Sequence, residues 1–349
     1  MFHSFLTFIN QLGVDLHKQR SLLTVSGGID SVVMAHLFQR AGFKAGIAHC
    51  NFGLRGEESD MDEAFVRNLA ASYGFPFFVK HFETKAYAKK KGISTQMAAR
   101  DLRYSWFREI GSDGFEWIAT AHHVNDSLET VLLNLVRGTG IAGLHGISPI
   151  NGNLLRPMLF ATKDEILQYA EKHGLSWRED RSNMSLDYKR NIIRKKVVPV
   201  LEELNPSLTN TFGLTSEKVA SAQGLLGKFL VEWRNRVVKI DGGFVLIPIV
   251  ALETEENATY LLWSVLEPLG FTYIQCKQVC AALDATSGGV YFSATHELLK
   301  EREMLVVRKQ RNGESENEVL ISGPGAFRLG QDIFRLEEKA ACNACDISN

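Results

Sequence analysis

LLTVSGGIDS, residues 22–31, passes from an apolar run through two glycines into a helical pattern. We expect a buried strand, a tight turn at Gly27 and Gly28, and the N-terminus of a helix. Glycine lets a ligand approach the backbone closely, and the free N–H groups of a helix N-terminus attract phosphate. Because Asp30 would repel a bare phosphate, we predict a nucleotide with Mg²⁺ between them. The predicted cofactor-binding residues of this loop are Ser26, Gly27, Gly28, Ile29, Asp30 and Ser31.

This loop differs from the two commonest phosphate loops. It contains neither GxxxxGK[ST], in which a lysine follows the glycines, nor GxGxxG. An ordinary turn between a strand and a helix, with serine as the N-cap, would contain the same residues without binding a ligand. Chemistry elsewhere in the chain therefore has to support a nucleotide site.

The composition is typical of a globular protein. The chain has 349 residues, of which 45% are hydrophobic and 23% charged, and its formal net charge is −1. This length allows two or three domains, and a nucleic-acid partner would have to bind local basic patches. No apolar run is long enough to span a membrane, and the N-terminal segment lacks a signal-peptide pattern. We therefore expect a cytoplasmic protein with no membrane partner, whose five cysteines form no disulfide framework.

Strands and helices alternate along the first half of the chain. Apolar strand patterns are expected at 22–25, 43–48, 75–81 and 117–121, with helical segments between them. This order predicts an α/β fold with a doubly wound parallel sheet, whose ligands bind at the carboxyl ends of the strands.

A second polar segment, HHVNDSLET at residues 122–130, follows the last of these strands. His122, Asp126 and Glu129 are spaced by four and three residues, so they share one face of a helix. At the same edge of the sheet as SGGIDS, they would suit Mg²⁺ or a cationic substrate amine. Acidic residues also favour a helix N-terminus electrostatically without any ligand, but this alternative leaves the two histidines unexplained.

Basic residues are densest in two places. Arg100 and Arg103 lie on adjacent turns of an expected helix at 94–107, and we predict that one of them reaches a phosphate, because arginine suits phosphate geometry. The segment YKRNIIRKK at 188–196 interleaves basic with polar side chains, as phosphate-contacting surfaces do. A solvated helix face is the alternative for this segment.

The pattern changes after residue 196, where long helical segments replace the glycine-rich loops. We predict a catalytic domain at 1–196, a smaller, mainly helical domain at 197–316, and the start of an incomplete domain or tail at 317–349. The strands expected within the second domain are at 244–249, 289–292 and 304–307, the last two as a hairpin.

Seven segments carry a resemblance to a known family: SGGIDS (26–31), NFGLRGEES (51–59), AARDLRY (98–104), AHHVNDSLETVLLNLVRGTG (121–140), LLRPML (154–159), WREDRSN (177–183) and YKRNIIR (188–194). Their order and spacing resemble the tRNA(Ile)-lysidine synthetases, PP-loop enzymes of the ATP pyrophosphatase superfamily. The resemblance covers residues 21–199, and beyond it only the layout is similar.

The resemblance implies a ligase that joins the side-chain amine of L-lysine to carbon 2 of the wobble cytidine in tRNA(Ile) with a CAU anticodon. It implies ATP and Mg²⁺ as cofactors, an adenylated tRNA intermediate, and release of AMP and pyrophosphate. Asp30 would bind Mg²⁺ through ATP. By the same resemblance, the catalytic residues are Asp30, His122, Asp126, Glu129, Arg190 and Arg194, and Arg100 and Arg137 join the loop in binding ATP.

Two positions depart from the family pattern, and two other functions stay open. Phe52 stands where the family usually has His, and Met97 stands where an acid is common, so we assign a catalytic role to neither position. A PP-loop cytidine thiolase is the close alternative, although that chemistry calls for paired cysteines near the loop and the CxxC here is Cys342 to Cys345. A nucleotide-binding module without turnover is the other alternative. A homodimer is among the assemblies that the sequence allows.

Overall fold

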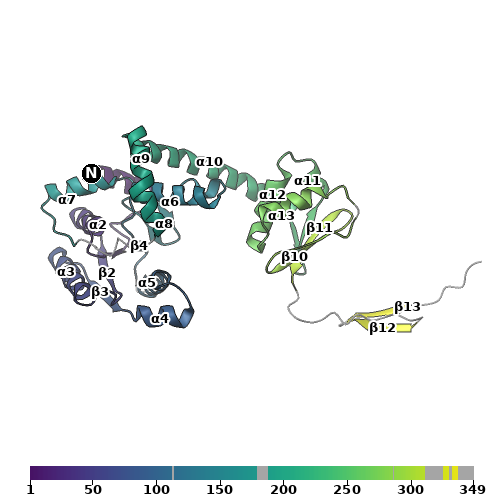
Figure 1. Ribbon diagram of the computed structural model, residues 1–349, viewed down its shortest axis with the longest axis horizontal. Coiled ribbons are helices and arrows are strands. Elements are labelled where there is room, and N and C mark those ends of the chain that lie inside the picture. The colour runs from purple at the N-terminus through teal and green to yellow at the C-terminus, as the bar shows by residue number, and fades with distance from the viewer. Residues whose placement is uncertain (112–113, 179–187, 286, 311–324, 330–331, 337–349) are drawn as a thin grey trace, which may run out of the picture. The chain divides into compact units, whose positions relative to one another are not determined.

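The computed structural model describes residues 1–111, 114–178, 188–285, 287–310, 325–329 and 332–336 (Figure 1). The chain forms two compact units, Met1–Leu225 and Leu226–Asn349. Among the described residues, no helix combines the length and the apolar character needed to cross a membrane.

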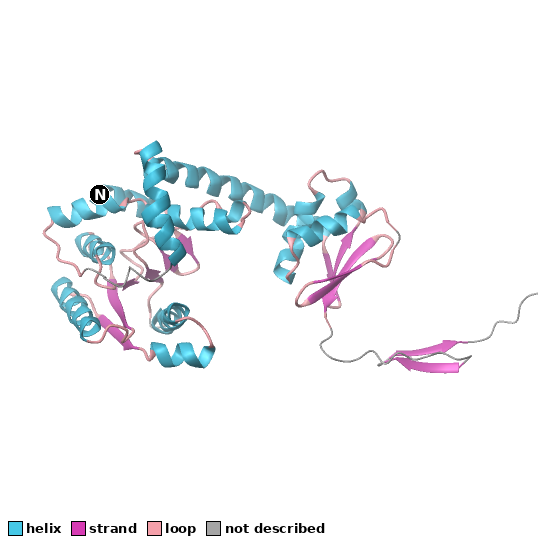
Figure 2. Cartoon of the chain, viewed as in Figure 1, coloured by secondary structure: helices cyan, strands magenta, loops and turns pink. Residues whose placement is uncertain are grey.

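A six-stranded sheet lies at the centre of the first unit (Figure 2). Its strands are β1 (Ser21–Thr24), β2 (Ala45–Asn51), β3 (Phe77–His81), β4 (Trp117–Ala119), β5 (Ile150–Asn151) and β6 (Leu154–Leu155), in the order β3-β2-β1-β4-β6-β5. All neighbours are parallel except β5 and β6. The strand order reverses between β1 and β4, where Leu22 is paired with Ile118. In open α/β sheets, ligands bind beyond the carboxyl ends of the strands at such a reversal.

Helices cover both faces of this sheet. Successive side chains of β1 point to opposite faces, so its adjacent leucines leave an apolar surface on each face that helices bury. The helices are α1 (Phe2–Gln11), α2 (Ile29–Arg40), α3 (Glu57–Tyr73), α4 (Thr84–Lys91), α5 (Thr95–Gly111), α6 (Val124–Arg137), the short η1 (Ile141–Gly143) and α7 (Lys163–Lys172). Leu23 packs in one core cluster with Phe38 of α2 and Ile166 of α7, whereas Leu22 packs in another with Phe107 of α5. The predicted doubly wound α/β fold is therefore confirmed.

The first unit continues through a run of helices that pack on α6. They are α8 (Tyr188–Ile192), the π-helical turn η3 (Ile193–Val197), α9 (Val198–Leu204) and α10 (Leu208–Val237), whose residues up to Leu225 belong to this unit. Ile193, Val198 and Phe212 share a core cluster with Val124 and Leu128 of α6. Because of this packing, the first unit extends to Leu225, beyond the boundary that we predicted near residue 196.

The second unit combines helices with a five-stranded antiparallel sheet. Its elements are β7 (Lys239–Asp241), β8 (Phe244–Pro248), α11 (Val250–Glu253), α12 (Ala258–Leu266), η4 (Glu267–Leu269), α13 (Tyr273–Ala281), β9 (Val290–Phe292), β10 (His296–Lys300) and β11 (Met304–Lys309). The strand order is β7-β8-β11-β10-β9, and Trp233, Ile247, Leu262 and Leu298 are buried in its core. The sheet is larger than the sequence predicted, since β7 and β10 were not expected.

The hairpin predicted from residues 289–292 and 304–307 needs a correction. β10 lies between β9 and β11 and pairs with both, so these strands form a three-stranded meander. In the region predicted as an incomplete domain, β12 (Gly325–Leu329) and β13 (Asp332–Leu336) pair antiparallel. Cys342 and Cys345 lie outside the described residues.

Candidate active site

The SGGIDS loop joins β1 to α2 in a conformation that favours glycine. Gly27 has a φ of 95°, and Gly28 is the N-cap of α2 with an extended backbone. Ser31 Oγ donates to the carbonyl oxygen of Gly28 at 2.8 Å, and the backbone N–H of Ser26 donates to Ser31 Oγ at 3.2 Å. The hydroxyl of Ser31 therefore bridges two backbone groups of the turn and holds the loop in this conformation.

Three helices begin close together at the edge of the sheet where β1 and β4 end. They are α2, α6, whose N-cap is His123, and α7, whose N-cap Thr162 accepts a hydrogen bond from the N–H of Glu165 at 3.2 Å. Asn125 Oδ1 accepts the backbone N–H of Lys163 at 2.9 Å, which joins the first turns of α6 and α7. Because each helix N-terminus carries partial positive charge, this arrangement favours an anion.

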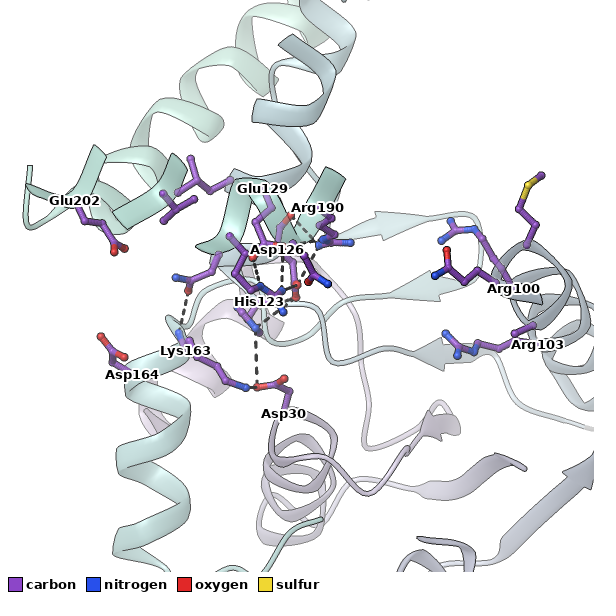
Figure 3. A pocket seen from close by; sticks show the side chains of 18 residues that line it. Asp30, Arg100, Arg103, His123, Asp126, Glu129, Lys163, Asp164, Arg190 and Glu202 are labelled. Carbon is purple, nitrogen blue, oxygen red and sulfur yellow. Dashed lines mark hydrogen bonds and ion pairs between the residues drawn. The ribbon is translucent and has the colours of Figure 1, made fainter. Parts of the chain in front are cut away.

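Asp30, in the first turn of α2, is paired with a lysine from α7 (Figure 3). Lys163 Nζ lies 2.5 Å from Asp30 Oδ1, and His123 Nε2 lies 3.9 Å from the same oxygen. The side chain of Asp30 is 32% exposed. The predicted Mg²⁺ ligand is therefore accessible, and an ammonium group binds one of its oxygens.

The two predicted carboxylates of α6 are held by two arginines. Glu129 Oε2 accepts from Arg190 Nε at 2.7 Å, and Glu129 Oε1 accepts from Arg194 Nε at 2.6 Å. Asp126 Oδ1 accepts from Arg190 Nη2 at 3.1 Å. Charge-assisted bonds of this kind are roughly twice as strong as neutral ones. The four side chains thus form one mixed-charge cluster, where the sequence had suggested an acidic helix face and a separate basic segment.

Arg190 lies in α8 and Arg194 lies in η3, which follows α8 directly. Ile193 of η3 packs in one hydrophobic cluster with α6, and this packing brings the arginines to the carboxylates. Arg190 and Arg194 are four residues apart, so they lie on neighbouring turns of one side. Glu129 is only 3% exposed, although the arginines are 32% and 45% exposed. The carboxylate of Glu129 therefore lies buried at the bottom of the cluster, and the two arginines lie at its solvent-exposed edge.

Burial and neighbouring charges set the protonation of this edge. Burial lowers the pKa of His122 to about 4, so its ring is neutral at neutral pH, and its Nδ1 lies 2.9 Å from Thr120 Oγ1. Burial by itself raises the pKa of Asp126, but His123, His122 and Arg190 outweigh burial and bring that pKa below its usual value. Asp126 is therefore ionised at neutral pH.

Asp30 and the mixed-charge cluster line one pocket of about 820 Å³ (Figure 3). Pockets of this size hold nucleotide-sized ligands. Arg100 and Arg103 of α5 also line it, at a distance from the cluster in Figure 3. The charged lining consists of five acids and five bases, which are Asp30, Asp126, Glu129, Asp164, Glu202, Arg100, Arg103, Lys163, Arg190 and Arg194. A pocket balanced in this way can bind anions and cations together.

Seven of the predicted residues do not line this pocket, namely His122, Arg137 and five residues of the SGGIDS loop. His123, which is 4% exposed, lines it in place of His122. Arg137 is exposed at the last position of α6, about 16 Å along the helix from Asp126, so the geometry lends no support to an ATP contact there. The loop residues Ser26, Gly27, Gly28, Ile29 and Ser31 adjoin Asp30 without lining the pocket.

Sequence reasoning missed Lys163 and Asn125 as site residues. Residues 162–165, TKDE, have the sequence of a capping box at a helix start, and the observed bond between Glu165 and Thr162 has that geometry. The contact of Lys163 with Asp30 has no local signal, because the two residues are 133 positions apart. Asn125 lies within HHVNDSLET, which could have marked it as a candidate.

The two departures from the family pattern lie on this side of the first unit. Phe52 stacks on Phe82 with ring centroids 5.4 Å apart, and the guanidinium of Arg103 lies 5.2 Å from the Phe52 ring centroid. Met97 lines the pocket and is 56% exposed. Phe52 therefore packs as an aromatic support for Arg103.

The carboxylate of Asp30 fits a metal ion that arrives with a nucleotide. Within the described ranges, no group of three or more His, Cys, Asp or Glu side chains is arranged to hold a metal ion. Mg²⁺ commonly uses one or two protein carboxylates, with phosphates and water completing its shell. Asp30, beside three helix N-termini, could supply such a carboxylate.

A parallel sheet with SGGIDS at its strand-order reversal is the arrangement of an ATP-using PP-loop enzyme. Residues 2–201 match the family described as the PP-loop domain, and residues 240–310 match the TilS substrate binding domain. The tRNA(Ile)-lysidine synthase of Bacteroides thetaiotaomicron is 39% identical over 305 residues, which cover 87% of this chain and 71% of that protein. The chain therefore belongs to the tRNA(Ile)-lysidine synthase family, a family of enzymes.

A second relative supports this assignment, and one solved structure supports the fold. The tRNA(Ile)-lysidine synthase of Parabacteroides distasonis is 38% identical over 321 residues, covering 92% of this chain and 73% of that protein. Among solved structures, the U34-tRNA thiolase NcsA from Methanococcus maripaludis, with its [4Fe-4S] cluster, superposes with a TM-score of 0.51 at 19% identity. It covers 62% of this chain and 78% of its own, and the likeness concerns the fold alone.

Proposed function

We propose that this chain joins L-lysine to carbon 2 of the wobble cytidine in tRNA(Ile) with a CAU anticodon, forming lysidine. The cytidine O2 attacks the α-phosphorus of ATP, and pyrophosphate leaves. The deprotonated side-chain amine of lysine then attacks carbon 2, and AMP leaves with the oxygen. The observation that carries the proposal is that one pocket joins an anion site at Asp30 to the mixed-charge cluster.

ATP is assigned to the side of the pocket where α2, α6 and α7 begin. The partial positive charges of these N-termini and Lys163 counter the phosphate charge, and Asp30 would hold Mg²⁺. Such preorganised charge stabilises the leaving pyrophosphate in a nucleotidyl transfer.

Lysine is assigned to the mixed-charge cluster. Free lysine carries a carboxylate and two ammonium groups, so its site needs acids and bases together. Arg190 and Arg194 can bind the lysine carboxylate bidentately, while Asp126 can accept an ammonium, since it is ionised at neutral pH. Glu129 would fix the arginines, because both of its oxygens are bonded to them. Positioning of this kind converts amine attack into an effectively intramolecular step.

The tRNA is assigned to the second unit and to the arginines of α5, and this replaces the ATP contact that the sequence predicted for Arg100. Arg100 and Arg103 line the pocket away from the cluster, where a cytidine and its phosphates would enter, and residues 240–310 match a substrate binding domain. ATP, lysine and tRNA meet in the cytoplasm, which is the compartment that we expect. The homodimer stays a prediction, and light scattering after size-exclusion chromatography tests it.

The test is lysine incorporation. The full chain is incubated with MgATP, labelled lysine and a tRNA(Ile) transcript with a CAU anticodon, and we expect label in the RNA with one AMP formed per lysine. A transcript with uridine at the wobble position is the matched control and should remain unlabelled. ATP binding without pyrophosphate release under any combination of substrates would instead identify a non-catalytic module, and sulfur incorporation without lysine would identify a thiolase.

A further inference from the structure

Lys163 is anchored at its backbone and extended at its side chain. It is the first residue of α7, after the N-cap Thr162, and its N–H donates to Asn125 Oδ1 at 2.9 Å. Its side chain is 44% exposed and lines the pocket. The main chain of Lys163 is therefore fixed between two helix starts, whereas its four-carbon stem has room to change partner.

The present partner of Lys163 is the oxygen that Mg²⁺ would use. Lys163 Nζ lies 2.5 Å from Asp30 Oδ1, and His123 Nε2 lies 3.9 Å from that oxygen. An ammonium and a divalent cation that bind the same carboxylate oxygen lie close together and repel each other strongly. Mg²⁺ at Asp30 and Lys163 in its present position therefore compete.

We infer that Lys163 exchanges Asp30 for a phosphate oxygen of ATP when MgATP binds. This inference rests on the proposed function, because that function brings ATP and Mg²⁺ to Asp30. In the empty site Lys163 neutralises Asp30. In the loaded site Mg²⁺ takes the carboxylate, and Lys163 binds the pyrophosphate part of the nucleotide. In both states Asp30 and Lys163 each lie next to a group of opposite charge, and the exchange needs no movement of the helix start that carries Lys163.

The exchange predicts two effects of opposite sign for Lys163→Met. Without the ammonium, Asp30 is free to bind a divalent cation, so the affinity for Mn²⁺ alone should rise. The pyrophosphate part of ATP loses a charge-assisted hydrogen bond, so the affinity for MgATP should fall. AMP lacks the pyrophosphate part, so its affinity should stay unchanged. A lysine that only neutralised Asp30 would raise the first affinity without lowering the second.

Isothermal titration calorimetry on the full chain measures these affinities with Mn²⁺, MgATP and AMP as separate probes. For Lys163→Met we expect MgATP to bind about tenfold more weakly, which is about 1.4 kcal/mol, and Mn²⁺ to bind severalfold more tightly. Lys163→Arg keeps the charge and should retain MgATP affinity within about threefold. Lys172→Met, at the exposed end of the same helix, is the matched control and should resemble the wild-type chain with all three probes.

Unchanged or tighter MgATP binding by Lys163→Met would overturn the exchange, and so would an equal loss of AMP affinity, since that indicates general damage to the site. A wild-type chain that binds MgATP but incorporates no lysine overturns the proposed function alone. A wild-type chain that binds no MgATP overturns both.

Discussion

Replacing Glu129 with Gln removes the buried charge that holds Arg190 and Arg194. Glu129 is 3% exposed and accepts three hydrogen bonds from these arginines, at 2.7, 2.6 and 3.0 Å. Breaking a fully buried pair costs about 3–5 kcal/mol. Here the arginines are 32% and 45% exposed, so water can solvate them after the change. We therefore expect a loss of about 2 kcal/mol in the free energy of unfolding.

For a unit of this size, a loss of about 2 kcal/mol lowers the Tm by roughly 4–8 °C. The assay is heat denaturation followed by circular dichroism. Glu109→Gln is the control, because the ion pair of Glu109 with Lys80 is 67% and 40% exposed, and it should leave the Tm unchanged. Adding Arg194→Leu to Glu129→Gln should restore part of the loss. A Tm for Glu129→Gln within about 1 °C of wild type would refute the view that this carboxylate organises the cluster.

Three further outcomes are expected. Asp30→Asn should lower lysine incorporation by about 100-fold or more while the far-UV circular dichroism stays unchanged; equal activity would remove Asp30 from the metal site. Lowering the pH from 6.5 towards 4 should reduce the free energy of unfolding by at most about 3 kcal/mol, because His122 takes up a proton in the unfolded chain before it does so in the folded one. Urea titrations should show a shallower pH dependence for His122→Gln. Gly27→Ala should cost about 1–2 kcal/mol of stability because its φ of 95° suits glycine, whereas Gly28→Ala, at a φ of −70°, should cost much less.

The sequence predicted the sheet well because both faces of its strands are buried and their apolar patterns are continuous. It also predicted that SGGIDS and HHVNDSLET lie together, since β1 and β4 are parallel neighbours and both motifs follow their carboxyl ends. These inferences depend on local patterns and on general rules of α/β topology. The strand β10 was missed because its sequence, HELLK, has two adjacent leucines between charged residues and so lacks the alternation of a half-buried strand.

The rest of the site depends on contacts between distant parts of the chain. The pairing of Arg190 with Glu129 spans 61 positions, and that of Lys163 with Asp30 spans 133. A charge run by itself does not reveal which partner neutralises it. The sequence predicted His122 in the pocket, and the structure has His123 there. This error is small, because a shift of one residue at a helix start turns a different ring towards the pocket.

The π-helical turn η3 makes the site depend on the number of residues between Arg190 and Arg194. Its hydrogen bonds span five residues, where those of an α-helix span four, and it follows directly after the short helix that carries Arg190. Deleting one residue between Arg190 and Arg194 would rotate one guanidinium by about 100° relative to the other, so only one could reach Glu129. Exchanging side chains at residues 191–193 leaves that phase intact. Insertions and deletions in this segment therefore disrupt the site more than substitutions do. The number of residues in the segment is the property that selection would have to preserve.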